Sequence, residues 1–512
     1  MSSRCPAFVQ NVITLALFAL AIIASSCGRA PRQQGVAGDQ AAVAKIAVLP
    51  FENLTGDAAL DWVRNAGPAM LGDELAGSAH VTAVGVGSLA DARVAGIPQV
   101  LHTYFTRERS GNLRVHFEME DAASLRVEPA AFTTGTLLGA VDDLAHRLDP
   151  QARGFSTSNP LAMEAWGQGA FEHAVELDPD FGAAWLSWVR TLAQSGKTDD
   201  ALQTADRALA RKTLRTDWSR SELRVLIANI RKDIPGRAAA LSDLAHLAPS
   251  DAAALTAAAQ AQGVARNFQA SADLYRKVLA ADPSNAAAMN ALGYAEGFLG
   301  DVETARRIFE DYGRQPGSRV NSHDSLGEVY FMNGRFREAE KEFSQAIALD
   351  PNFLQGAPMV KAAYAHWLAG DLAGADAMFQ KYAAAVAKRN VPLAVWREST
   401  WLYATGRQDR AEAMLAKAQP DERIRLQLAI WKNAARLPSG LENLRALYIA
   451  TPPARDGIER ILYGSALVEA GKEAEARTIL KRWPLPENSS QPEIDTIVFP
   501  KYLELRKKLE MN

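Results

Sequence analysis

The sequence has few cysteines and no excess of charge of one sign. Among its 512 residues only Cys5 and Cys27 are cysteines, so the chain beyond Cys27 can form neither a disulfide nor a cysteine-ligated zinc site. Lysine and arginine total 56 against 59 acidic residues, a formal net charge of −3. This balance argues against non-specific nucleic-acid binding, which needs clustered basic residues. A hydrophobic content of 48% with 22% charged residues excludes wholesale disorder.

Long hydrophobic runs are also scarce, and the exception lies near the start of the chain. An uninterrupted apolar run extends from Val12 to Ala24. As a helix it would span about 20 Å, which is short of the roughly 30 Å hydrocarbon core of a bilayer. Its length and its position after Arg4 predict a signal peptide over residues 1–26.

The segment Ala24-Ser25-Ser26-Cys27-Gly28 resembles the lipobox of bacterial lipoproteins, with Ala24 where that family usually has Leu. The resemblance implies that Cys27 is diacylated and becomes the first mature residue. Acyl chains then hold the protein at the periplasmic face of a membrane, and Gly28 in place of Asp favours the outer membrane. Ordinary signal cleavage and an uncleaved short anchor are the alternatives. A polar linker is expected at 27–44.

The pattern over residues 45–150 predicts a small α/β domain. KIAVLPF and HVTAVGVG read as strands, and the segment ALDWVRNAGPAMLGDELA has helical spacing of apolar residues. Two alternating segments, 99–107 and 113–120, flank Ser110-Gly111-Asn112 and predict a β-hairpin. A further strand is expected near 125–132, followed by a helix over 135–148.

IAVLPFENLTGD and QVLHTYFTRERSGNLRVHFEMEDA resemble the TolB-like amino-terminal α/β domain. Members of that family often carry this domain before tetratricopeptide repeats, as in certain adenylate cyclases, Ser/Thr kinases and membrane-anchored transcription regulators. Those relatives have their catalytic or DNA-binding module ahead of the membrane segment. In this sequence the expected signal peptide occupies the position of that module, so the resemblance does not imply the catalytic or DNA-binding activities of those relatives.

From 159 to 484 the chain is repetitive. Pro249 to Pro283 and Gly300 to Gly334 are both separated by 34 residues, the tetratricopeptide period. Glycine should end the first helix of each pair with φ > 0, and alanine five residues later should allow close helix approach. The repeat-defining pairs are Gly196/Ala201, Gly300/Ala305, Gly334/Ala339, Gly370/Ala375, Gly406/Ala411 and Gly471/Ala476. The segment 485–512 is expected to be a tail with a short helix.

The predicted fold class is therefore mainly α: a tetratricopeptide α-solenoid preceded by a small α/β domain. Such an array has a concave surface, which the first helix of each pair lines by resemblance to the family. The resemblance implies a stripe of amides, acids and aromatics that binds a protein or peptide; packing of the aromatics between repeats is the alternative. The stripe comprises Asn290, Tyr294, Phe298, Asn321, Asp324, Glu328, Phe331, Tyr364, Trp367, Trp396 and Tyr403.

Motifs for chemistry are weak. Gly85–Ala90 matches a G-x-G-x-x-A pattern without phosphate-binding context, and Gly196-Lys197-Thr198 lies on a repeat turn rather than in a P-loop. The eight histidines are scattered outside any H-E-x-x-H motif. We therefore expect no catalytic residues, no metal, no cofactor, no nucleic acid and no small-molecule substrate.

Three hypotheses follow. The first is a non-enzymatic, lipid-anchored envelope scaffold that binds a protein through its repeats. The second makes the α/β domain a periplasmic sensor or assembly module, with the repeats as a spacer. The third is an enzyme with a site between the two parts.

Overall fold

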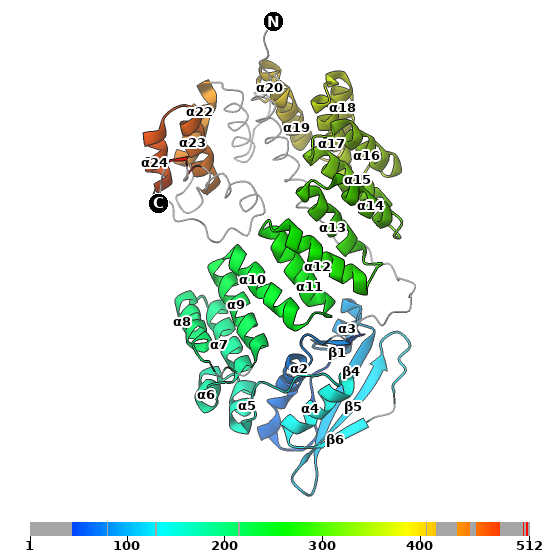
Figure 1. Cartoon of the computed structure of the whole chain (residues 1–512), viewed down its shortest axis with the longest axis vertical. Coiled ribbons are helices and arrows are strands. Elements are labelled where there is room, and N and C mark those ends of the chain that lie inside the picture. The colour runs from blue at the N-terminus through cyan, green and yellow to red at the C-terminus, as the bar shows by residue number, and fades with distance from the viewer. Residues whose placement is uncertain are drawn as a thin grey trace. The chain divides into compact units, whose positions relative to one another are not determined.

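A computed structural model describes residues 44–78, 80–128, 131–212, 214, 216–405, 407–415, 438–450, 457–481, 505, 508 and 509. Cys27, Gly406, the expected signal peptide and linker, and most of the expected tail lie outside these residues. The chain divides into two compact units, one spanning Val36–Ala295 and the other containing Glu296–Asn512. The first holds the α/β domain and the earlier helical hairpins, and the second holds the later hairpins (Figure 1).

The α/β domain contains a six-stranded sheet with the order β3-β1-β4-β5-β6, and β2 pairs with β4. The interior strand β1 is parallel to both neighbours, β3 and β4, whereas β5 is antiparallel to both β4 and β6. The strands are β1 (Ala44–Val48), β2 (Glu52–Asn53), β3 (Val81–Gly85), β4 (Gln99–Arg107), β5 (Leu113–Asp121) and β6 (Ala131–Gly135).

The expected hairpin is confirmed, with Gly111 at φ +89 in the turn between β4 and β5. The strand expected near 125–132 begins later, at Ala131. Leu125 adopts a left-handed φ of +57, and its amide donates to the carbonyl of Asp121. The residues after β5 therefore turn back before the last strand starts.

Helices cover both faces of the sheet, as the consecutive burial of Ile46, Ala47 and Val48 in β1 requires. Ile46 and Val48 pack in one core with α2 (Val63–Glu74) and α4 (Leu137–Leu148). Ala47 faces the other way, toward α3 (Leu89–Ala95). The core on the α2 and α4 side continues into the first helical hairpins, where Phe155, Trp166, Phe181 and Trp185 join it.

The helical part consists of hairpins in which consecutive helices pack on one another. The helices of the first unit are α5 (Pro160–Gly167), α6 (Phe171–Leu177), α7 (Gly182–Gln194), α8 (Thr198–Leu209), α9 (Asp217–Arg231), α10 (Ile234–Leu247), α11 (Ala252–Val264) and α12 (Phe268–Ala281). The boundary between the units falls within α13 (Ala286–Leu299). The second unit holds α14 (Val302–Gly313), α15 (Arg319–Met332), α16 (Phe336–Leu349), α17 (Ala357–Leu368), α18 (Leu372–Ala387), α19 (Val391–Ala404), α20 (Gln408–Leu415), α22 (Pro438–Ala450), α23 (Gly457–Glu469) and α24 (Glu473–Lys481).

The repeat register is visible in the backbone. Gly196, Gly300, Gly334, Gly370 and Gly471 all have φ between +74 and +93, which ends the first helix of each hairpin without the steric cost that a Cβ would bring. The paired alanines are fully buried, at 0% exposure: Ala201, Ala305, Ala339, Ala375, Ala411 and Ala476. Each lies where a larger side chain would separate the helices of a hairpin.

Candidate functional site

The predicted partner-binding residues lie on the first helices α13, α15, α17 and α19. Asn290, Tyr294, Asn321, Glu328 and Trp367 are half-buried, and Phe298 is 53% exposed. Asp324, Phe331 and Tyr364 are buried, so in this structure they pack the repeats instead of facing solvent. Trp396 and Tyr403 belong to α19, but their side chains are outside the described part of the chain.

A buried ion triad joins α15 to α17. The Lys361 ammonium lies 2.7 Å from Oδ2 of Asp324 and 2.5 Å from Oε1 of Glu328. The two acids are one helical turn apart, so both can face one cation. Lys361 is only 2% exposed. Burial alone would lower its pKa, but the carboxylates of Glu328 and Asp324 hold that pKa above its ordinary value.

One lysine cannot compensate two carboxylates in full. Burial raises the pKa of Asp324 to about 6, although the charge of Lys361 opposes the shift. Within the described residues, the second oxygen of Asp324, Oδ1, is buried without a hydrogen-bond donor. Glu328 is the more accessible member, with its side chain 20% exposed. The triad therefore fixes α15 against α17 and leaves one acid at the surface.

An aromatic cluster lies beside the triad. Trp401 of α19 is 1% exposed and stacks on Phe379 at 4.8 Å between ring centroids. Tyr364 and Trp367 meet the same indole edge-on, at 5.3 and 5.9 Å. The indole nitrogen of Trp401 donates to Asp376 at 2.7 Å. Tyr364 is thus part of the packing between hairpins, and Trp367 forms its half-buried edge.

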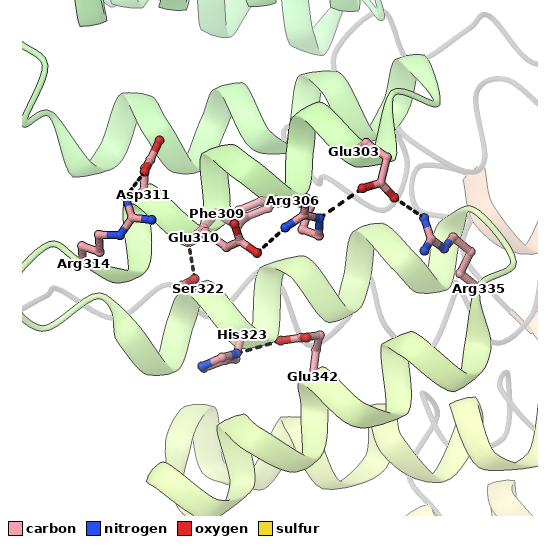
Figure 2. Close-up of polar contacts among 10 residues, drawn as sticks. All are labelled: Glu303, Arg306, Phe309, Glu310, Asp311, Arg314, Ser322, His323, Arg335 and Glu342. Carbon is pink, nitrogen blue, oxygen red and sulfur yellow. Dashed lines mark hydrogen bonds and ion pairs between the residues drawn. The ribbon is translucent and has the colours of Figure 1, made fainter.

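Charged pairs also connect α14, α15 and α16 (Figure 2). Glu303 accepts from Arg306 at 3.1 Å and from Arg335 at 2.8 Å. His323 of α15 contacts Glu342 of α16 at 2.7 Å. The Glu303 pairs are well exposed, and exposed ion pairs contribute little to stability because solvent screens them. This network holds neighbouring helices in register and brings no reactive group together.

In the first unit, acids cluster where the α/β domain meets the repeats. Asp73 is the penultimate residue of α2, and Glu222 lies on α9. Arg153 lies in the segment between α4 and α5, and its guanidinium is 4.0 Å from the centre of the Trp218 ring. Burial raises the pKa of Asp73 to about 6 against the charge of Arg153. Burial and the charge of Asp73 raise the pKa of Glu222 to about 7.

Glu74, next to Asp73, is the most perturbed acid of this cluster. It is 1% exposed, and neither carboxyl oxygen has a hydrogen-bond partner among the described residues. Burial is the largest cause that raises the pKa of Glu74 to about 9, and repulsion from the charges of Asp142 and Asp73 adds to it. A buried carboxyl without a donor is stable only in its neutral form, so Glu74 is protonated near neutral pH.

Sequence reasoning missed Lys361, Trp401 and the cluster around Glu74. Lys361 and Asp324 are 37 residues apart, and no local pattern marks them as partners. The two weak motifs have structural positions: Gly85–Ala90 joins β3 to α3, and Gly196-Lys197-Thr198 forms the turn between α7 and α8. Among the described residues, no group of three or more histidines or acids is placed to hold a metal. None of the described helices is both long and apolar enough to span a membrane.

Comparisons with known proteins bear on the repeats. Residues 320–353 match the model of the tetratricopeptide repeat, whereas no curated protein matches the chain. A tetratricopeptide repeat protein from Parabacteroides merdae is similar in structure at 13% identity and a TM-score of 0.33, over 58% of this chain and 99% of that one. PilF of Pseudomonas aeruginosa is similar at 17% identity and a TM-score of 0.28, over 52% of this chain and 96% of the PilF chain. Yeast Tom70 is similar at 12% identity and a TM-score of 0.33, over 72% of this chain and 92% of Tom70. The chain is thus a mainly α-helical protein with tetratricopeptide-type repeats and a small α/β domain, which confirms the predicted fold class.

Proposed function

We propose that the protein is a non-enzymatic envelope lipoprotein that binds another protein or a peptide through the first helices of its repeats. Acylated Cys27 would hold it at the periplasmic face of a membrane, with the outer membrane favoured. Tetratricopeptide repeats are typically scaffolds for protein–protein interaction, and the match at 320–353 supports that general role.

The observation that carries the proposal is the accessible edge of α15 and α17. Asn321, Glu328 and Trp367 are half-buried on these first helices, so each presents part of its side chain. Each is also held in place. Asn321 donates to the Tyr312 hydroxyl at 2.9 Å, Glu328 contacts Lys361, and Trp367 packs on Trp401. Polar and aromatic groups on a rigid base lose little side-chain entropy when a partner binds.

The test compares two double variants of the full chain as bait. Asn321→Ala with Trp367→Leu changes the first helices, and Lys341→Ala with Gln345→Ala changes the second helix α16 as a matched control. Both should keep the far-UV circular dichroism of the parent. Proteins captured from an envelope fraction should be lost with the first variant and retained with the control. Equal capture by both would exclude this edge as the partner surface.

The lipid anchor has a separate test, because a scaffold can bind partners without one. The intact mass of the membrane-extracted protein should correspond to a chain that begins at Cys27 and carries acyl groups. A Cys27→Ser variant should leave the membrane fraction. A mature chain that begins elsewhere, or an unmodified Cys27, would contradict the lipoprotein assignment and leave the scaffold proposal intact.

The hypothesis that the α/β domain is the active part needs a test of its own. Because Phe155, Trp166 and Phe181 share a core with the sheet, deletion of residues 45–150 would expose that core and confuse the result. A surface change is cleaner. Phe132 is 50% exposed on β6, 5.8 Å from the His116 ring. Loss of partner capture by Phe132→Ser, with the α15 and α17 edge intact, would favour the α/β domain.

A further inference from the structure

A pocket lies between the first two helical hairpins, in the first unit. Its volume is about 490 Å³, within the range of roughly 300–1,000 Å³ for small-ligand sites. Phe171, Trp188 and Leu192 form an apolar floor, and Glu172, Glu176 and Lys197 are exposed around it. The first three come from α6 and α7, and all three are half-buried.

The pocket follows from the lengths of the helices. α6 has 7 residues and α7 has 13, so at 1.5 Å per residue α6 is about 9 Å shorter than the helix it packs on. It cannot cover the whole of α7. Thr191 and Ser195, near the end of α7, line the pocket where a longer second helix would cover them.

The Trp188 ring is held in place by its own chain. Trp185 stacks on it at 5.7 Å with an interplanar angle of 26°. The guanidinium of Arg207, from α8, lies 5.4 Å from the Trp188 ring centre and 5.6 Å from that of Trp185. This indole already contacts one guanidinium group, which is the cation that stacks most readily on tryptophan.

The charge around the pocket favours a cation. Glu172 and Glu176 are four residues apart on α6 and therefore lie on one side of the helix. His173 contacts Glu176 at 3.3 Å, whereas Glu172 forms no ion pair with any residue that the structure describes. Lys197 is the only fixed positive charge among the residues that line the pocket; Arg207, which contacts the Trp188 ring, is not one of them. An anionic ligand would be repelled by the carboxylates of Glu172 and Glu176 and attracted only by the ammonium of Lys197 in this lining.

We propose that this pocket binds an arginine side chain of a partner protein. The three methylenes of the arginine would cover Phe171 and Leu192, and the planar guanidinium would meet the Trp188 face and the carboxylates of Glu172 and Glu176. Guanidinium suits such a site better than ammonium because it combines stacking with directed pairs of hydrogen bonds to carboxylates. The pocket thus forms a contact point on the first unit, separate from the repeats of the second.

The test uses N-acetyl-arginine amide as the probe and the full chain labelled with 5-fluorotryptophan. The chain has 10 tryptophans, and the Trp188 fluorine signal is identified by its loss in Trp188→Phe. We expect a saturable shift of that signal on titration. N-acetyl-citrulline amide, which keeps the shape without the charge, should bind at least about fivefold more weakly, a difference of about 1 kcal/mol.

A double variant tests the two acids. Glu172→Gln with Glu176→Gln should weaken binding of the arginine probe at least about fivefold, while Glu52→Gln with Glu128→Gln, exposed acids of the α/β domain, should not. Absence of a saturable shift up to about 50 mM probe, or equal binding of the citrulline probe, would overturn the proposal. Equal binding by the two double variants would also overturn it. The citrulline comparison needs no variant, so it holds even if the substitutions disturb folding.

Discussion

Replacing Glu74 by glutamine should stabilise the protein at alkaline pH and leave its stability at acidic pH nearly unchanged. The folded-state pKa of Glu74 is raised from 4.5 to about 9. A carboxyl whose pKa is raised on folding contributes stability that is fully present below its unfolded pKa and is lost as the pH rises through the folded value. The loss therefore falls between about pH 4.5 and pH 9. A glutamine side chain does not ionise, so the variant lacks this dependence.

The magnitude follows from the size of the shift. One pKa unit corresponds to about 1.36 kcal/mol, so ionisable Glu74 lowers stability at about pH 8, relative to about pH 4.5, by up to about 4 kcal/mol. We expect the Glu74→Gln protein to exceed the parent by about 2–4 kcal/mol near pH 8 and by less than about 1 kcal/mol near pH 4.5. Glu222 adds the same pH dependence to both proteins, and that of Asp73 cancels wherever Glu74 is neutral.

The assay is urea unfolding followed by far-UV circular dichroism at about pH 4.5, 6 and 8. Glu128→Gln, an exposed acid in the same unit, is the matched control and should follow the parent at every pH. A stability difference between parent and Glu74→Gln that is the same at all three values would refute the reasoning. It would mean that Glu74 ionises without a folding cost, through a donor that compensates its charge.

Three further predictions concern the second unit. Lys361→Met should lower the free energy of unfolding by about 3–5 kcal/mol because the buried carboxylate of Asp324 and the partly exposed one of Glu328 lose their cation, and adding Asp324→Leu should restore part of it in the same urea assay. Gly327→Ala should cost about 1–3 kcal/mol, since a Cβ there would lie 2.6 Å from the Phe343 ring; an unchanged melting temperature would show that the ring moves freely. Arg335→Ala should cost less than about 1 kcal/mol, and the cost should disappear in high salt. A loss that persists in high salt would mean that Arg335 acts through packing.

The repeats could be predicted from the sequence because their requirements are local. The end of a first helix needs a residue that adopts positive φ, such as Gly334, and the contact between two helices needs a small residue, such as Ala339. Both residues therefore belong to one short sequence motif. The β4–β5 hairpin was predictable for the same reason, through Gly111 in its turn. These features depend on residues only a few positions apart.

The candidate sites could not be predicted in that way, because they depend on residues that only the fold brings together. Asp324 and Phe331 satisfy the spacing expected of a concave surface, yet Lys361 and the neighbouring helices bury them. The raised pKa of Glu74 arises from burial and from Asp142, which lies on another helix. The pocket beside Trp188 exists because α6 is short, and hydrophobic periodicity does not fix where a helix begins and ends.

The place of β1 in the sheet affects how the protein would respond to a pulling force. β1, which begins at Ala44, is an interior strand that pairs in parallel with β3 on one side and β4 on the other. Tension applied along this strand from its amino-terminal end would act on the hydrogen bonds to both neighbours in shear, so that many bonds carry the force at once. The bonds of an edge strand pulled away sideways would instead break one after another. A tether attached upstream of Ala44 would therefore pull on an interior strand of the sheet and not on an edge strand.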